Sequence, residues 1–116
     1  MPKLVNLTPH EVRIFLPNGR EISIPPSGMV ARVREVVEDV GELELEDGAV
    51  VPLRRKFLSS EIEGLPEPEE GTIYIVSYLA AQAGWLAGRH DVVSTGDPVR
   101  DNEGRIIGVK SLYVKP

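Results

Sequence analysis

Apolar and polar residues alternate along the first part of the chain, which predicts β-strands joined by tight turns. From Val12 to Leu16 apolar residues occupy alternate positions, and Asn18-Gly19 follows as a two-residue hairpin turn. The residues from Arg20 to Ile24 then return as the antiparallel partner. Pro25-Pro26-Ser27-Gly28 ends that strand, because proline lacks an amide donor. The first third therefore predicts a β-hairpin.

The next segment predicts further β-structure. Met29 to Val40 is rich in valine and begins with strand-like alternation, which favours a strand with a bulge, although its later part also fits a helical turn. Leu43 to Leu53 predicts a second hairpin that turns at Asp47-Gly48. Ser60 to Gly71 is acidic and contains several prolines, so we expect an ordered surface loop there.

One helix is predicted, over about residues 77–88. Thr72 to Val76 is β-branched and aromatic, as expected of a buried strand, and Ser77 follows at a helix N-cap position. Tyr78 to Ala87 is rich in alanine and leucine, and Gly88 is placed to end the helix. Its small residues permit close packing against a sheet or a partner subunit; they are Ala80, Ala81, Gly84 and Ala87.

The last part returns to strands. Val92-Val93 leads into an expected turn at Ser94-Thr95-Gly96, and Asp101 to Gly104 reverses the chain into Arg105 to Val109. At 116 residues, the chain has the length of a single domain, 1–116. The predicted fold class is α+β, with a mainly antiparallel β-sheet built of hairpins and one prominent α-helix.

Composition excludes several functional classes. Thirteen Lys and Arg residues against eighteen Asp and Glu residues give a net charge of −5, which argues against duplex nucleic-acid binding. The absence of cysteine excludes disulfides, thiolate catalysis and cysteine-ligated zinc. No apolar run approaches about 18 residues, so we expect no membrane span and a soluble, cytoplasmic protein.

Catalytic patterns are weak. Ser77, Ser94 and Thr95 lie near His90 in the sequence, but nothing resembles a nucleophile elbow or an oriented base. The glycine spacing matches neither a dinucleotide-binding loop nor a P-loop. We therefore expect no enzymatic activity, no cofactor and no metal site.

Ligand-binding candidates are more informative. Arg32 and Arg100 lie on predicted strands beside turns, where a fixed guanidinium suits phosphate oxygens, although both positions also fit ordinary surface arginines. Tyr74 offers an aromatic face for base stacking, although a tyrosine in a buried strand more commonly fills the core. His10 either faces solvent or lines the edge of a pocket.

Several segments together resemble small proteins of bacteriophages and prophages, over nearly the whole chain. These segments are Asn6-Leu7-Thr8-Pro9-His10, Ile24 to Gly28 before Ala31-Arg32, Tyr74 to Ser77 before the Ala-rich helix, and Asp97 to Gly108. Within that group the chain resembles the first Thoeris anti-defence family. The resemblance implies a β-rich, non-enzymatic sponge that sequesters cyclic ADP-ribose isomers or other cyclic nucleotides and assembles as a homodimer or homohexamer.

The resemblance also implies roles for individual residues. Arg32 and Arg100 would hold the phosphates, and Tyr74 would stack on the base. Further polar contacts would come from Ser77, His90 and Asn102. An alternative is a small phage protein that inhibits a host protein through its acidic surface around Glu61 to Glu70, and a nucleotide hydrolase or lyase ranks last.

Overall fold

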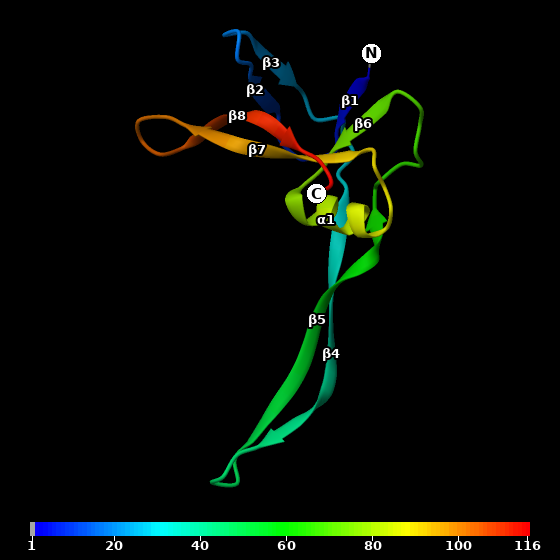
Figure 1. The fold of residues 1–116 in the computed structure, drawn as a ribbon, viewed down its shortest axis with the longest axis vertical. Coiled ribbons are helices and arrows are strands. Elements are labelled where there is room, and N and C mark those ends of the chain that lie inside the picture. The colour runs from blue at the N-terminus through cyan, green and yellow to red at the C-terminus, as the bar shows by residue number, and fades with distance from the viewer. Residues whose placement is uncertain (1) are drawn as a thin grey trace.

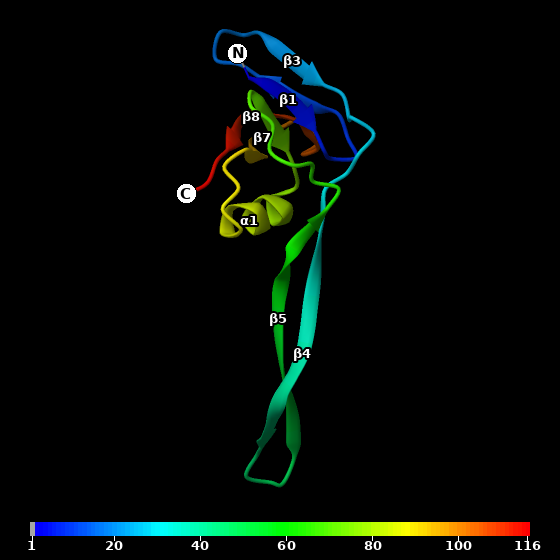
Figure 2. The same ribbon diagram turned by 90° about the vertical axis from the view of Figure 1, so that its right-hand side faces the viewer.

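The described residues, 2–116, fold into a six-stranded sheet with one helix, and a two-stranded arm projects from this body (Figures 1 and 2). The computed structural model describes residues 2–116. The elements, in order, are β1 (Lys3–Asn6), β2 (Val12–Phe15), β3 (Glu21–Ile24), β4 (Arg32–Glu44), β5 (Val50–Glu63), β6 (Thr72–Ile75), α1 (Tyr78–Leu86), β7 (Val92–Arg100) and β8 (Ile106–Tyr113). The predicted α+β class, with antiparallel hairpins and one helix, is confirmed.

The sheet combines parallel and antiparallel pairs in the order β1-β6-β7-β8-β2-β3. Strands β2 and β3 form one antiparallel hairpin and β7 and β8 form another, as the turn sequences predict. Strand β6 pairs in parallel with β1 and β7, and β2 pairs in parallel with β8 at Ile14 and Val109. Strands β6 and β7 are consecutive and are connected through α1, whereas the β1–β6 and β2–β8 pairs join segments far apart in the sequence, which local patterns did not predict.

Both faces of β6 are buried, because it lies inside the sheet with α1 over one face. Tyr74 and Val76 pack beneath the helix with Ala81 and Trp85. Ile75 points to the other face, where it packs with Val93. The body therefore has two apolar clusters, one on each side of the central strands.

Helix α1 confirms the predicted helix and its cap. The Ser77 hydroxyl accepts a hydrogen bond from the Ala80 amide at 3.2 Å. Ala80, Ala81 and Gly84 are buried within the protomer, and a side chain at Gly84 would meet Val92 of β7. These three small residues are therefore covered by the protein's own sheet rather than left open for a partner subunit, and only Ala87 of the predicted set is exposed.

Trp85 anchors the helix to the sheet. It is 7% exposed, and its indole N–H donates to the Val92 carbonyl at 3.0 Å. Tyr78 meets the indole edge to face, with ring centroids 6.3 Å apart. The packing of α1 is therefore fixed by a directional contact as well as by apolar burial.

Two expectations about loops are wrong. Ser94-Thr95-Gly96 makes no turn but lies within β7, because Gly96 is needed where the Tyr113 ring lies against the strand backbone. The acidic segment from Ser60 is a loop only after Glu63, since β5 runs to that residue. The two apolar stretches predicted before and after Gly41 join into one long strand opposite β5.

Candidate functional site

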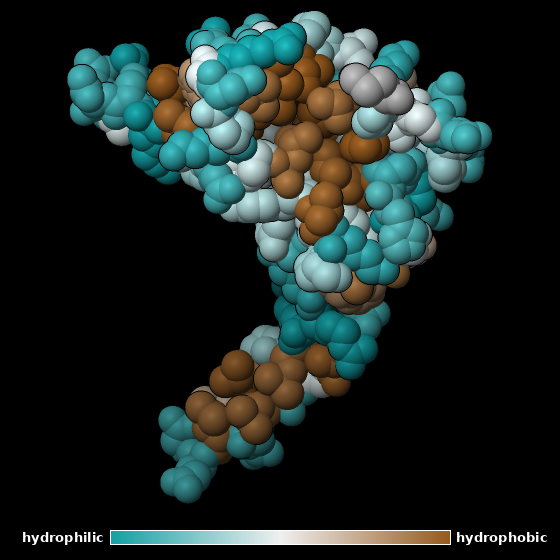
Figure 3. Space-filling model, turned by 45° about the horizontal axis from the view of Figure 1, so that its top comes forward, coloured by the Kyte–Doolittle hydropathy of each residue, from teal (hydrophilic) through white to brown (hydrophobic). Residues whose placement is uncertain are grey.

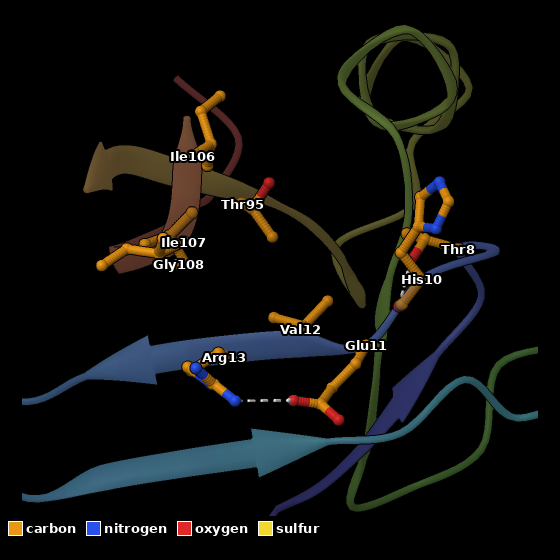
Figure 4. Close-up of a pocket in the computed structure, with 10 residues that line it drawn as sticks. Thr8, His10, Glu11, Val12, Arg13, Thr95, Ile106, Ile107 and Gly108 are labelled. Atoms are coloured by element: carbon orange, nitrogen blue, oxygen red, sulfur yellow. Dashed lines mark hydrogen bonds and ion pairs between the residues drawn. The ribbon is translucent and has the colours of Figure 1, made fainter. Parts of the chain in front are cut away.

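A groove opens where strands β2 and β8 part. The two strands pair at Ile14 and Val109, and towards the start of each strand a hollow of about 470 Å³ lies between them (Figure 4). This volume is within the range of small-molecule sites. The groove is lined by Thr8, His10, Glu11, Val12, Arg13, Thr95, Ile106, Ile107, Gly108 and Val109.

The groove combines hydrogen-bonding groups with an apolar wall. Thr8, His10 and Thr95 supply hydroxyl and imidazole groups. Ile106 and Ile107 of β8 are 57% and 42% exposed, so both offer apolar surface to the groove. Such a surface suits a ligand with one flat apolar part and one polar part.

Gly108 sets how closely the two strands approach. A Cβ at this position would overlap the Phe15 ring and lie 2.9 Å from the Arg13 carbonyl oxygen. Only glycine therefore lets β8 lie this close to β2, and the groove opens beside that contact.

A buried asparagine holds the loop that forms one end of the groove. Asn6 is 1% exposed, and its side-chain amide donates to the carbonyl oxygens of His10 and Ile24 at 2.8 and 3.0 Å. Its oxygen accepts from the Thr8 amide and hydroxyl at 2.9 and 2.6 Å. Thr8 and His10 therefore have a fixed backbone. The sequence reasoning did not assign this role to Asn6.

The charges inside the groove largely cancel. Arg13 forms an ion pair with Glu21 at 2.9 Å and lies 3.7 Å from Glu11. Additional positive charge for an anionic ligand must therefore come from the rim of the groove.

Arg100 lies at that rim. It pairs in register with Ile106, a lining residue. Its guanidinium donates to the Gly104 carbonyl at 2.7 Å, and no acidic partner for it is found among residues 2–116. Asn102 is exposed in the same turn. The structure thus brings Arg100 and Asn102 together beside the outer end of the groove.

Arg32 lies near the other end. Ala31 donates its amide to the Leu7 carbonyl, so Arg32 begins β4 close to the Thr8 loop. The Leu7 amide donates to the Ile75 carbonyl, and Ile75 pairs in register with Val93 at the start of β7. Arg100 lies at the other end of β7. At about 3.3 Å per residue, the strand from Val93 to Arg100 is roughly 20 Å long, and Arg32 lies towards its Val93 end. One protomer therefore presents two separate cations rather than a pair.

The other predicted residues are dispersed. Tyr74 is 3% exposed in the core beneath α1, so its ring has no free face for stacking. The exposed aromatic residue nearby is Tyr78, on the rim of a second hollow of about 370 Å³. Ser77 caps the start of α1, and His90 is exposed beyond its end. The helix thus separates this serine from this histidine, and no Ser–His dyad forms between them.

The ionisable groups with a shifted pKa lie outside the groove. Hydrogen bonds from Arg89, both 2.8 Å long, hold the pKa of Asp91 below its ordinary value despite partial burial. The same contact raises the pKa of Arg89, which also donates to the Pro66 carbonyl at 2.9 Å. This pair fastens the loop after β5 to the start of β7 and is structural.

Two aspartates near the β7–β8 turn serve as hydrogen-bond acceptors. Backbone amides, that of Arg105 above all, lower the pKa of Asp101. The Ser111 and Tyr113 hydroxyls lower the pKa of Asp97. Asp101 therefore caps the β7–β8 turn, whereas Asp97 lies within β7 and is bonded to side chains of β8.

Three further findings bear on function. Within residues 2–116, no group of three or more His, Asp and Glu side chains is arranged to hold a metal ion. Over the same residues, no helix has the length and apolarity needed to cross a membrane. Comparison of the chain with known protein families, curated proteins and solved structures finds no match.

Proposed function

We propose that this protein is a phage anti-defence sponge, which binds and sequesters a cyclic ADP-ribose-type signalling nucleotide without cleaving it. The groove between β2 and β8 carries the proposal, because it joins hydroxyl and imidazole groups to an exposed isoleucine wall in a volume suited to a nucleotide. The resemblance of the sequence segments to the first Thoeris anti-defence family supports the same ligand class.

Each part of such a ligand has a chemical counterpart. The base would lie against Ile106 and Ile107, and the hydroxyls of Thr8 and Thr95 would meet the ribose or phosphate oxygens. Arg100 at the rim would contact the pyrophosphate, since its guanidinium has no competing carboxylate among the described residues. Glu11 and the net charge of −5 disfavour long polyanions and favour a compact ligand.

A second copy completes the proposed site. Arg32 and Arg100 lie far apart in one protomer, so both would hold one pyrophosphate most readily when they come from different protomers of a dimer or hexamer. Such a sponge would act in the cytoplasm of the host cell.

Calorimetric titration with the cyclic ADP-ribose isomers tests the proposal. We expect saturable binding by the wild type, and at least tenfold weaker binding after Ile107→Asp, which places a carboxylate in the groove. Val50→Asp is the matched control, because Val50 is similarly exposed but lies on the arm. The proposal is wrong if no isomer binds, or if Ile107→Asp binds as tightly as Val50→Asp.

A further inference from the structure

Strands β4 and β5 form an arm that extends far from the body (Figures 1 and 2). The described chain measures 63 × 39 × 26 Å, with a radius of gyration of 18.8 Å, whereas a compact chain of this length has about 13 Å. An isolated two-stranded hairpin is at best marginally stable in water. The arm therefore lacks the second layer that β-structure normally packs against.

The register of the arm separates two unlike faces, because residues opposite each other on paired strands share a face. One face, which we call the apolar stripe, consists of Val36, Gly41, Leu43, Leu45, Ala49, Val51, Leu53 and Phe57, interrupted by the Glu38–Arg55 pair. Leu43 and Leu53 are 50% and 41% exposed. Figure 3 shows apolar side chains gathered on the distal arm, with a hydrophilic band between them and the body.

The opposite face of the arm carries more charge. It presents Glu42 and Glu44 near the tip and the Asp39–Arg54 ion pair at 3.1 Å, beside the apolar residues Val37, Val50 and Pro52. Nearer the body, Leu58 belongs to this face and lines a hollow with Trp85 and Leu86. Helix α1 therefore lies on the side away from the start of the apolar stripe, which leaves the stripe uncovered.

The edges of the arm discourage strand addition. Pro52 in β5 has no amide hydrogen to offer a further strand, and the register shift between Asp39 and Gly41 bends β4. An association that buries the stripe must therefore use its face rather than its edges.

We propose that the apolar stripe packs face to face on the same stripe of a second copy, with both arms pointing in the same direction. The two copies are then related by a two-fold axis parallel to the arms. Each β4 residue of one copy faces a β5 residue of the other copy, namely the residue that is its register partner within a single chain. Leu53 of one copy faces Gly41 of the other, and Leu45 faces Ala49. Large side chains thus meet small ones at these two positions, whereas Leu43 faces Val51 and Val36 faces Phe57 as apolar contacts.

The same arrangement matches charge. Within one chain, Arg55 donates to the Glu38 carboxylate at 3.1 Å. About the two-fold axis, Glu38 of each copy also faces Arg55 of the other, so the one charged pair in the stripe becomes a four-residue network. This self-complementarity favours a second copy of the chain over an unrelated partner, and the dimer requires no ligand.

Charge reversal with sedimentation velocity tests the dimer. Glu38→Arg and Arg55→Glu each set like charges against each other in a homodimer, so each variant alone should dimerise at least tenfold more weakly than the wild type. An equimolar mixture of the two variants restores both opposite-charge contacts between copies, and should recover a heterodimer. Both substitutions break the same intrachain pair, so a merely structural effect would not be rescued by mixing.

The matched controls are Asp39→Arg and Arg54→Asp, which break the equivalent ion pair on the opposite face. Both should remain dimers, and circular dichroism should show that all four variants stay folded. A monomeric wild type at micromolar concentration would overturn the proposal. The proposal would also be overturned if the control variants lost as much dimer affinity as the stripe variants, or if the equimolar mixture stayed monomeric.

Discussion

The side-chain amide of Asn6 donates a hydrogen bond to the backbone carbonyl of His10 at 2.8 Å, from a position that is almost completely buried. Because the same side chain also bonds Thr8 and Ile24, it joins the end of β1, the loop at the groove and the end of β3. The candidate site thus depends on a residue that does not line it.

Replacing Asn6 by alanine should lower the free energy of unfolding by about 2–3 kcal/mol, because buried backbone groups lose their partners. Urea unfolding measures this loss. Asn102→Ala is the control, since Asn102 is exposed in a turn, and it should cost no more than about 0.5 kcal/mol. Equal losses in the two variants would contradict the role assigned to Asn6.

Gly96→Ala should also destabilise the protein, by about 1–3 kcal/mol. A Cβ at Gly96 would overlap the Tyr113 ring, and Gly96 has no positive φ that would complicate the comparison. The same substitution in a Tyr113→Ala background should cost less, since the ring is then absent. A double-mutant cycle by chemical denaturation checks this, and identical costs in both backgrounds would exclude the proposed contact.

Asp91→Asn should lower the free energy of unfolding at pH 7 by about 1–3 kcal/mol, because it leaves Arg89 without its carboxylate. The two side chains are 18% and 20% exposed, so solvent screens this pair only in part. Glu103→Gln removes a well-exposed partner of Arg105 and should cost less than about 1 kcal/mol. Urea unfolding at pH 7 measures both losses of stability. A larger loss for Glu103→Gln than for Asp91→Asn would contradict this prediction.

The contribution of Asp91 should depend on pH. Its pKa is lowered in the folded state by hydrogen bonds from Arg89, so the folded protein favours the charged form. The stabilisation is complete above the ordinary value of about 3.9 and is lost as the pH falls through the lower folded-state pKa. The stability difference between wild type and Asp91→Asn should therefore shrink below about pH 4. A constant difference down to pH 2 would contradict this.

Arg100→Ala and Arg32→Ala should each weaken binding of a cyclic ADP-ribose-type ligand by roughly 10- to 150-fold, because a charge-assisted hydrogen bond contributes about 1.5–3 kcal/mol. Lysine at either position should restore only part of the affinity, because it supplies the charge but lacks the planar guanidinium fork. Arg20→Ala, in the exposed β2–β3 turn, is the calorimetric control. If both Arg100→Ala and Arg32→Ala bind the ligand with unchanged affinity, the proposed arginine–phosphate contacts are wrong.

Local sequence patterns predicted the elements that local chemistry determines. Asn18-Gly19 and Asp47-Gly48 mark hairpins, and Ser77 marks the start of the helix. The pairing of β1 with β6 joins Lys3 to Thr72, and no local signal records a contact across that distance. The sequence predicts a turn at Gly96 because glycine is common in turns, whereas in the structure this glycine leaves room for the Tyr113 ring.

The candidate site was predictable only in part. Strand-end arginines are recognisable in the sequence, and both Arg32 and Arg100 are exposed. The burial of Tyr74 was not predictable, because a central strand covered on both faces has no polar side to orient it. The groove itself arises where β2 and β8 diverge, so it requires the parallel pairing that the sequence did not reveal.

The central claim, binding without turnover, is tested most directly by recovering the ligand. The protein is mixed with excess cyclic ADP-ribose isomer, freed of unbound ligand by gel filtration and denatured, and the released compound is analysed by mass spectrometry and chromatography. We predict that the nucleotide is retained in a fixed ratio to protein and released chemically unchanged, and that Ile107→Asp retains much less of it. Release of a hydrolysed product, or no retention by the wild type, would contradict the account.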